Sequence, residues 1–548
     1  LVLCGKQAID GDTAQVGPEL AVLLGWPLVP YAEEITLDEP VPGGSGGAGE
    51  RGAEIRSMTE TGYAVFRTGL PAVVTAVKDI GVPRLPALSG WARALTEPVR
   101  RLGPSELDIT REMTGLRGSP TRVEKIRGVA HTKHTEFPEP GRRETIQRVA
   151  EVLLAAGSGG AMRSVEGGIR EPSGGATPGE ADSAAFCGGG PVIAVIGEAV
   201  RDRLSGVSFE LCSIARKLAE ARKGRLFFAV PGCCSGESLA GAELPAAEEH
   251  VFIETGSAVF EANRYAEAVA AWVRRAEPEI LLGPGTLKGR AMMPLVAARL
   301  ETGLTADCTG LEIDPETGLL LQTRPAFGGN VLATIVCEDR RPQMATVRPR
   351  VFSADSYGRT NVEALRREGR PPRAFSFSSP GSGAAGTAGL EPGDMTGPAG
   401  AGMTGTSAHP RLIAEESLVS EGTDISDASL ILSGGRGLSG SEGFALLHRV
   451  AELTGGAVGA SRSAVEAGWA EYVRQIGQTG KTVQPAVYFA VGISGAVQHI
   501  VGMHDSDFVI ALNRDPEAPI FGAADIGIVD DFRSFLKRLI KLLEEKAG

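Results

Sequence analysis

Two glycine-rich stretches divide the 548-residue chain into segments that fold separately. Residues 157–190 contain 11 Gly among 34 residues, and residues 380–410 contain 9 Gly and 4 Pro among 31. Segments of this composition bury too little apolar surface to offset the conformational entropy lost on folding. We therefore expect linkers at 157–190 and 353–410, the second letting the last segment swing against the others. The predicted folded segments are 1–156, 191–352 and 411–548.

The second and third folded segments alternate short apolar runs with stretches of helical spacing. Runs such as PVIAVIG, RLFFAVPG and EILLGPG precede helix-like stretches in the second segment, and ASLILSGG, AVYFAVG and DFVIALN do so in the third. This alternation predicts an α/β protein with Rossmann-like parallel sheets in three units, the last one doubly wound. The final helix carries one apolar stripe: Phe532, Phe535, Leu536, Leu539, Ile540 and Leu543.

The first segment is less regular. Val2–Lys6 and Ala72–Val77 have the composition of strands, and the chain opens at Leu1 inside an apolar run without an initiator Met. We expect the N-terminus to be truncated within a strand, with half of a sheet upstream.

Charge and cysteine content exclude several classes of protein. A net charge of −12 argues against nucleic-acid binding, and no apolar run approaches the 18 residues of a membrane-spanning helix. The seven Cys form no CxxC pair, which disfavours structural zinc and iron–sulfur clusters and is typical of a reducing cytoplasm. No arrangement of His, Ser or paired carboxylates indicates hydrolysis, so no catalytic or metal-ligating residue is predicted.

A glycine motif gives the first indication of a ligand. Gly435–Gly440 reads GRGLSG, matching G-x-G-x-x-G, between a predicted strand over Ala428–Ser433 and a predicted helix over Glu442–Leu453. Glycines there let backbone N–H groups and a helix N-terminus approach a diphosphate. The acidic residue that binds the ribose of NAD is absent, because Gly459–Arg462 reads GASR. An arginine in its place suggests a cofactor that becomes negative, such as a reduced flavin.

Polar residues follow the other predicted strands of the last segment at the edge where open α/β sheets bind ligands. They occur in Gly477–Lys481, in Ser494–His499, at Asn513 and at Asp530-Asp531. A nucleotide pocket is the interpretation that best accounts for their position.

Longer motifs resemble a known family. GGRGL, VGASR, GQTGK, VGISGAVQH and NRDPEAPIF resemble the FAD-binding domain of the α-subunit of electron transfer flavoproteins, a DHS-like NAD/FAD-binding fold. Residues 191–352 resemble the first domain of the same subunit, through TGLTADCTGLEID and QTRPAFGGN. Residues 1–156 resemble the C-terminal part of the β-subunit, through GKQAIDGDTAQVGP and GLRGSPTRV. The resemblance implies a β–α fusion whose β part lacks its N-terminal half.

The resemblance implies a set of FAD contacts. Arg462 is expected over the isoalloxazine ring, where its charge favours the reduced, negative forms of flavin and raises the potential. Thr479 is expected near the redox-active edge, His499 as a donor to the pyrimidine oxygen, and Ser494 with the following N–H groups at the diphosphate. The full set is Arg436, Ser461, Arg462, Ile476, Gly477, Gln478, Thr479, Ser494, Gly495, Ala496, Val497, Gln498, His499, Asn513, Asp531 and Phe532.

A second nucleotide loop is implied near the start of the chain. The resemblance places AMP there in ordinary members and a second FAD in members that bifurcate electrons, and GDTAQVGP resembles the bifurcating branch. The residues of the nucleotide loop are Ala8, Ile9, Asp10, Gly11, Asp12, Thr13, Ala14, Gln15, Val16, Gly17, Pro18 and Glu19.

The same resemblance implies a loop that docks the redox partner. It aligns this loop with Pro83–Ala94 and its anchor residue with Leu88.

The resemblance implies an electron carrier more than an enzyme. It would take electrons from flavin dehydrogenases, such as the acyl-CoA dehydrogenases of fatty acid β-oxidation, and pass them to a quinone oxidoreductase or a ferredoxin in the cytoplasm. Two alternatives stay open: a bifurcating flavoprotein that oxidises NADH with a second FAD, and a truncated fusion that binds nucleotide without redox activity. At the level of residues, Arg462 could instead form a surface salt bridge, His499 could be a buried helix histidine, and Leu88 could pack inward.

Overall fold

The computed structural model divides into two compact units, each described here by itself. Unit 1 consists of residues 1–125, 188–324 and 334–416, and unit 2 of residues 126–187, 325–333 and 417–548. The residues described are 1–8, 11, 13–38, 51–60, 62–128, 135–139, 141–157, 190–200, 203–232, 239, 242–257, 259–326, 331–354, 358–376, 409–417, 425, 428–477, 480–504 and 506–547. Within these ranges no helix is long and apolar enough to cross a membrane.

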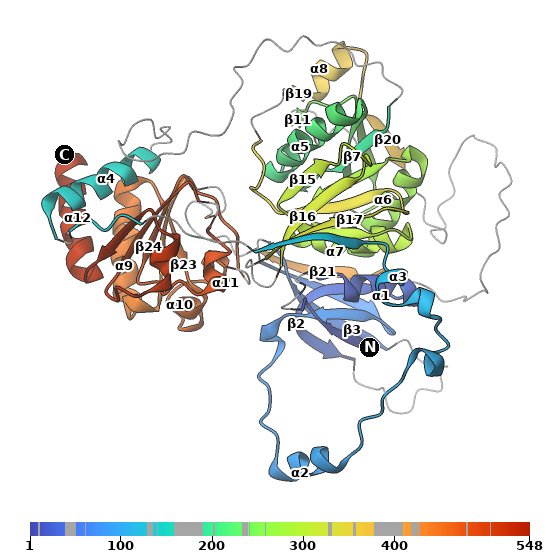
Figure 1. The fold of residues 1–548 in the computed structure, drawn as a ribbon, viewed down its shortest axis with the longest axis horizontal. Coiled ribbons are helices and arrows are strands. Elements are labelled where there is room, and N and C mark those ends of the chain that lie inside the picture. Colours follow the sequence, from blue (N-terminus) through green and yellow to red (C-terminus); the bar gives the residue numbers. More distant parts are fainter. Residues whose placement is uncertain are drawn as a thin grey trace. The chain divides into compact units, whose positions relative to one another are not determined.

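Unit 1 contains a seven-stranded sheet in which all neighbouring strands run parallel (Figure 1). Its strands are covered on both faces, as their continuous apolar runs predict. In spatial order they are β14 (Leu304–Cys308), β18 (Gln343–Val347), β13 (Ile280–Pro284), β7 (Val192–Ile196), β10 (Arg225–Gly232), β12 (Glu249–Glu254) and β20 (Arg373–Ser376).

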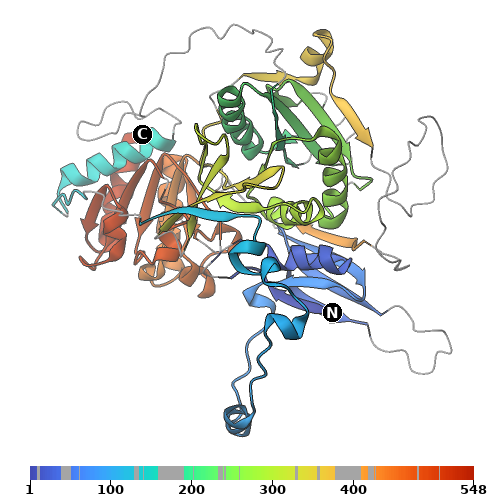
Figure 2. The same cartoon turned by 45° about the vertical axis from the view of Figure 1, so that its right-hand side comes forward.

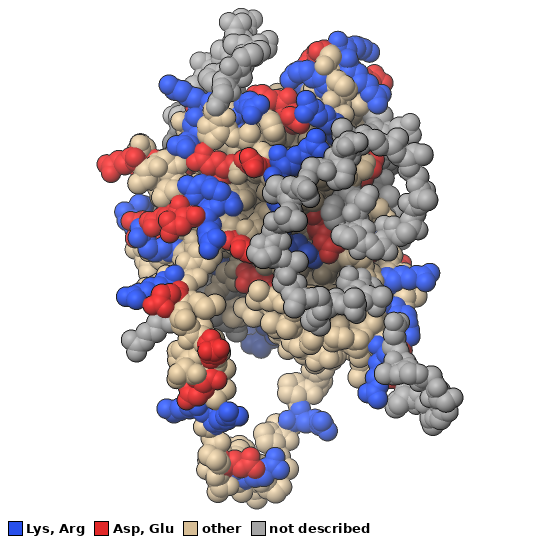
Figure 3. All heavy atoms as spheres, turned by 90° about the vertical axis from the view of Figure 1, so that its right-hand side faces the viewer, with Lys and Arg blue, Asp and Glu red and all other residues tan. Residues whose placement is uncertain are grey.

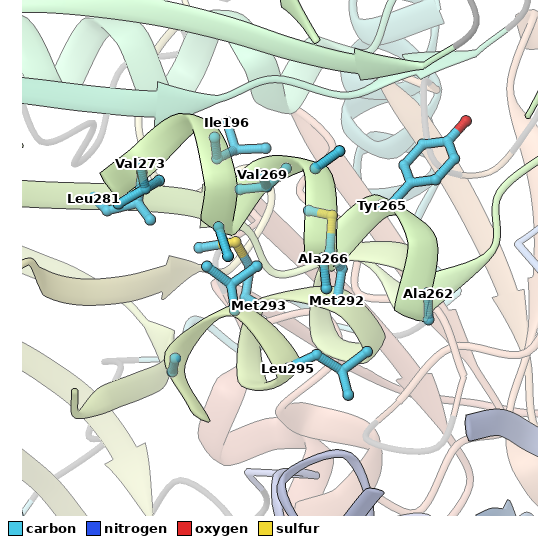
Figure 4. Packing of buried hydrophobic residues seen from close by; sticks show 14 of the residues in the cluster. Ile196, Ala262, Tyr265, Ala266, Val269, Val273, Leu281, Met292, Met293 and Leu295 are labelled. Carbon is cyan, nitrogen blue, oxygen red and sulfur yellow. The ribbon is translucent and has the colours of Figure 1, made fainter. Parts of the chain in front are cut away.

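Helices cover the two faces through alternate residues of each strand. Ile196 of β7 packs with α6 (Ala262–Ala276) and α7 (Leu287–Arg299), and Figure 4 shows this packing around Val269 and Met293. Val195 packs on the other face with α5 (Gly206–Arg222). Short elements complete this part of the unit: β8 (Ala199–Val200), β9 (Arg203–Leu204), β11 (Glu243–Pro245), β15 (Gly310–Ile313), β19 (Arg359–Asn361) and α8 (Val362–Arg367). Two further strands, β16 (Leu320–Ala326) and β17 (Val331–Val336), have residues in both units.

A second, mixed sheet of unit 1 is built from the start of the chain. The strands predicted over Val2–Lys6 and Ala72–Val77 are confirmed as β1 and β5, which pair in parallel. The spatial order is β1 (Val2–Gly5), β5 (Val73–Ala76), β2 (Leu28–Leu37), β3 (Gly52–Met58), β4 (Gly62–Gly69) and β21 (Arg411–Ser417).

This sheet and the seven-stranded sheet share one apolar core. Leu28 and Val73 lie in the same cluster as α6 and α7, together with Ala21 of α1 (Val16–Leu24). Two hydrogen bonds reinforce the packing: the Leu28 N–H donates to Asn263 Oδ1 at 2.9 Å, and the Tyr31 hydroxyl donates to the Leu287 carbonyl at 3.1 Å.

A long excursion leaves unit 1 after β5, with α2 at its tip (Figure 1). Its side chains are nearly all exposed, and Figure 3 shows Lys and Arg on both of its arms. Its elements are η1 (Lys78–Ile80), α2 (Leu88–Thr96), η2 (Pro104–Leu107), η3 (Arg111–Met113), α3 (Gly115–Gly118) and β6 (Arg122–Gly128).

Unit 2 is a doubly wound domain around a five-stranded parallel sheet. In spatial order the strands are β23 (Ala457–Ala460), β22 (Leu430–Gly434), β24 (Val487–Val491), β25 (Phe508–Asn513) and β26 (Ile526–Val529). One face is covered by α4 (Arg143–Gly157), α9 (Ser441–Thr454) and α12 (Phe532–Ala547). The other elements are η5 (Arg436–Leu438), α10 (Arg462–Glu466), η6 (Tyr472–Arg474), α11 (Val497–Ile500) and η7 (Pro519–Ala523).

Residues 135–139 and 141–156 belong to unit 2, although they precede the first glycine-rich stretch. Leu153 of α4 is fully buried in one cluster with residues of α9, α12 and the sheet. In Figure 2, α4 (teal) lies beside the orange and red elements of this unit. Glu136 forms a parallel bridge with Ile526, and Phe137 packs edge-on against Phe521 with ring centroids 5.3 Å apart. The first predicted segment thus contributes to both units, and β21 contributes to unit 1. The finer domain boundaries given by the sequence stay a prediction.

Candidate functional site: a glycine-lined edge of the five-stranded sheet

The site lies where the chain reverses its direction of winding in unit 2. From β22 the chain passes to β23 on one side and then to β24 on the other, so the loops after β22 and β24 meet at the topological switch point. The Gly435 N–H donates to the Val491 carbonyl at 2.9 Å, and the Gly437 N–H donates to the Gly492 carbonyl at 2.9 Å. Backbone groups therefore form the floor of this edge.

Glycine is required at this crossing. A Cβ on Gly435 would lie 2.2 Å from the Gly492 oxygen, and a Cβ on Gly437 would lie 2.7 Å from the same atom. Gly492 itself has φ +63°, a left-handed conformation that side chains disfavour. The G-x-G-x-x-G motif thus stands in the context that was predicted, between β22 and α9, and its glycines let the loops after β22 and β24 pack backbone against backbone.

Ser461 and Arg462 lie at the carboxyl end of β23. Ser461 is buried, and its N–H donates to the Gly434 carbonyl at 2.9 Å. Arg462 begins α10 and is about half exposed, with Nε donating to Glu466 Oε1 at 2.8 Å. An exposed pair of this kind contributes little to stability, so the guanidinium can exchange Glu466 for an anionic ligand at low cost. Arg436, after β22, is exposed as well.

The loop that contains the predicted residues Ile476–Thr479 packs against α11. The Ile476 N–H donates to the Ala460 carbonyl at 2.9 Å, which joins this loop to the end of β23. Gly477 has φ +139°, and a Cβ there would lie 2.7 Å from the Gln498 oxygen. Gln478 and Thr479 lie outside the described residues.

The segment Ser494–His499 follows β24 and combines an exposed loop with a buried histidine. Ser494, Ala496, Val497 and Gln498 are exposed. Gly495 has φ +87°, and a Cβ there would lie 2.1 Å from the Ile520 nitrogen, so only glycine fits.

His499 is 7% exposed and both of its ring nitrogens have partners within the protein. Nδ1 lies 3.1 Å from the Ile476 carbonyl oxygen, and Nε2 lies 2.9 Å from the Tyr488 hydroxyl. Burial lowers the pKa of His499 to about 4, against the opposing effect of the bond to Ile476, so the ring is neutral near pH 7.

Asn513, Asp531 and Phe532 have structural partners at the ends of β25 and β26. Asn513 Nδ2 donates to the Ile493 carbonyl at 2.8 Å and ties the ends of β25 and β24 together. Asp531 Oδ1 accepts from the Ser534 N–H at 3.1 Å and caps α12, while Phe532 is buried in the core beneath. The carboxyl edge thus brings together all the predicted FAD residues that the structure describes; their contacts with the cofactor stay a prediction.

The second predicted nucleotide loop joins β1 to α1 in unit 1. Gly17 lies in the first turn of α1, where a Cβ would be 2.4 Å from Thr75 Cγ2, so glycine permits close packing of the helix on β5. Gln15 Nε2 donates to the Leu304 carbonyl at 2.8 Å, and burial raises the pKa of Glu19. Ala8 and Val16 are exposed, whereas Ala14 and Pro18 are buried. Ile9, Asp10 and Asp12 lie outside the described residues.

A buried arginine cluster beside this loop was not predicted from the sequence. Arg324 is 5% exposed, and its Nη2 donates to the Gly11 carbonyl at 2.7 Å. Next to it, Asp307 accepts from Arg348 at 2.6 and 3.1 Å and from Arg290 at 2.8 Å. Burial alone would raise the pKa of Asp307, but the two guanidinium groups hold it well below its usual range. A visible signal was the arginine within the strand sequence LLQTRPA.

Leu88, the predicted docking anchor, does not pack inward. It is 85% exposed at the start of α2, and Trp91 and Leu95 on the same helix are 65% and 82% exposed. Residues three and seven positions apart share a helix face, so the three side chains form one exposed apolar stripe.

Comparisons with known proteins agree with this site. Residues 192–372 match a family model described as the electron transfer flavoprotein domain, and residues 424–504 match the electron transfer flavoprotein FAD-binding domain. The electron transfer flavoprotein subunit alpha of Thermoanaerobacterium thermosaccharolyticum is 38% identical over 353 residues, which cover 64% of this chain and 97% of that protein.

Two further relatives extend the comparison. The electron transfer flavoprotein subunit alpha of Megasphaera elsdenii is 37% identical over 65% of this chain and 97% of its own length. The lactate dehydrogenase (NAD(+),ferredoxin) subunit LctC of Acetobacterium woodii is 34% identical over 64% of this chain and 77% of its own. The chain therefore belongs to the electron transfer flavoprotein family, shares that family's α-subunit domains and binds FAD.

Proposed function

We propose that this protein carries electrons from a flavin dehydrogenase to a second redox partner. The observation that supports the proposal is the carboxyl edge of unit 2, where Gly435, Gly437, Gly492 and Gly495 let the loops pack closely at the switch point of the sheet, the place where open α/β sheets bind ligands. FAD supplies the chemistry when bound, because a flavin accepts electrons one or two at a time. The residues of the chain bind the cofactor, orient it and set its electrostatic environment.

Each group of residues has a role that follows from its position. Ser494 and the N–H groups of Gly495 and Ala496 lie on the loop after β24 and would hold the diphosphate. Arg462 is exposed at the same edge and would place a positive charge against the cofactor. Thr479 keeps its role near the redox-active edge as a proposal from family resemblance.

The partners are proposed from the exposed excursion of unit 1. The stripe of Leu88, Trp91 and Leu95 would dock a flavin dehydrogenase, such as an acyl-CoA dehydrogenase of fatty acid β-oxidation. The acceptor would be a quinone oxidoreductase or a ferredoxin, and the cysteine pattern supports a cytoplasmic location. We also propose that residues 1–156 correspond to the C-terminal part of a β-subunit fused to an α-subunit.

The visible spectrum of the purified protein, with released nucleotides counted per chain, tests the proposal. We expect a yellow protein with one FAD per chain, together with AMP in the loop after β1. A protein that stays colourless after incubation with FAD would contradict electron transfer. It would favour the alternative of a truncated fusion that binds nucleotide without redox activity.

A second candidate function, electron bifurcation from NADH with two FAD, rests on two observations. The relative LctC is named for a reaction that couples NAD(+) and ferredoxin. In this chain, the buried Arg324 bonds to Gly11 of the second nucleotide loop, which brings positive charge to the place where a second anionic cofactor would bind. Two FAD per chain and no AMP in the same measurement would favour this function over simple transfer.

Replacing Arg462 with Gln is expected to lower the reduction potential of bound FAD by on the order of 50 mV. The side chain loses its charge but keeps much of its length, and a fixed charge near a flavin changes the energy of the reduced form. Potentiometric titration measures the shift. Arg449→Gln is the matched control, because Arg449 is also an exposed helical arginine paired with a nearby glutamate. Equal potentials in the two variants would contradict the role given to Arg462.

A further inference from the structure

A buried tyrosine contacts the histidine of the FAD site. Tyr488 lies in β24 and its side chain is 0% exposed. Its hydroxyl lies 2.9 Å from Nε2 of His499, and Nδ1 of the same ring lies 3.1 Å from the Ile476 carbonyl oxygen. The three residues belong to three different segments, joined through one imidazole.

The positions of the protons follow from the chemistry of the partners. A carbonyl oxygen only accepts, so Nδ1 carries a hydrogen and donates it to Ile476. The ring is neutral because burial opposes its positive charge, which leaves Nε2 with a lone pair. The Tyr488 hydroxyl therefore donates to Nε2.

This ring joins the two loops predicted to contact FAD. Ile476 opens one loop, and His499 closes the other. The two loops touch through backbone atoms: a Cβ on Gly477 would lie 2.7 Å from the Gln498 oxygen. The His499 ring bonds to the Ile476 carbonyl beside this contact, so its orientation bears on the spacing of the two loops.

We infer that Tyr488 is a positioning residue: its hydroxyl fixes the ring of His499 in the neutral, Nδ1-protonated form and thereby sets the distance between the two loops. The proton positions on His499 do not depend on the proposed function; only the expected effect on FAD binding rests on it. In this arrangement the ring has no N–H left to donate to the cofactor. The donation to the pyrimidine oxygen expected from the resemblance would require one ring nitrogen to leave its partner in the protein, Tyr488 or Ile476.

Imidazole ¹⁵N spectra of the full chain without FAD are the first test. We expect Nδ1 of His499 to be protonated and Nε2 to be unprotonated near pH 7 in the wild type. The reverse assignment would overturn the inference, whatever the behaviour of any variant. In Tyr488→Phe, which keeps the ring and removes the hydroxyl, we expect the Nε2 signal to move and the Nδ1–H to exchange with water at least tenfold faster.

FAD titration of the same proteins tests the consequence. Loss of one buried hydrogen bond is expected to weaken FAD binding about tenfold in Tyr488→Phe. Tyr265→Phe removes the hydroxyl of a buried tyrosine in unit 1 and is expected to change neither the His499 signals nor the affinity for FAD.

The double variant tests whether Tyr488 acts through His499. If it does, Tyr488 has no further effect once the ring is gone, so Tyr488→Phe should weaken FAD binding less than twofold in a His499→Asn background. A full tenfold loss there, or unchanged affinity in the single variant, would overturn the inference. A wild type that binds no FAD would refute the proposed function and leave the spectra as the test of Tyr488.

Discussion

Replacing Asp307 with Asn is expected to destabilise unit 1 by about 3–5 kcal/mol. Asp307 is 2% exposed and carries the negative charge to which Arg348 and Arg290 bond. Asparagine presents one oxygen in place of two and no charge, so the guanidinium groups stay buried without compensation. Urea unfolding followed by circular dichroism measures the loss, and Asp339→Asn, on the exposed loop after β17, is the control expected to stay within about 0.5 kcal/mol of the wild type.

The same variant has a predictable dependence on pH. The pKa of Asp307 is lowered in the folded protein, so its contribution to stability is fully present above its unfolded value of about 4 and is lost as pH falls toward its folded value. The difference in unfolding free energy between wild type and Asp307→Asn should therefore shrink below about pH 4. A difference that stays constant from pH 7 to pH 3 would contradict the assignment of this energy to the carboxylate.

Local features of the fold could be predicted from the sequence because each depends only on residues that are close together in the chain. The strand before GRGLSG and the helix after it were predicted within two residues of β22 and α9. The apolar stripe of the last helix is buried in the structure, at Phe535, Leu536 and Leu539. In both cases the period of the pattern and the glycines are enough to fix the element.

Features that depend on distant residues could not be predicted. The stripe of α4 is visible in the sequence, but nothing near it shows that Leu153 packs on α12, nearly 400 positions later. The arginine cluster is similar, because a buried guanidinium needs a counterion and Asp307 comes from another strand. His499 was correctly placed at the sheet edge, yet its bond to Tyr488 depends on which way the ring turns, and sequence spacing does not give that direction.

Replacing Gly435 with Ala is expected to weaken FAD binding at least a hundredfold. The added Cβ would lie 2.2 Å from the Gly492 oxygen, a distance that real Cβ atoms do not reach, and the obstacle is backbone that cannot rotate aside. The loop after β24 must then move away from β22, and it carries Ser494, Gly495 and Ala496, which are proposed to hold the diphosphate. Because the Gly435–Val491 and Gly437–Gly492 hydrogen bonds are strained by the same shift, unit 2 should also lose several degrees in Tm.

Gly522→Ala separates this effect from the general cost of losing a glycine. Gly522 lies in η7 of the same unit, is exposed and has no atom within 4 Å of an added Cβ, so this variant should bind FAD as the wild type does. FAD titration and thermal unfolding of both variants distinguish two possibilities. If Gly435→Ala loses stability but keeps its affinity, the crossing of β22 and β24 supports the fold without forming the cofactor site. If it loses affinity while the unfolding transition stays cooperative, the glycine-lined edge is where the cofactor binds, because only the position of two loops has changed.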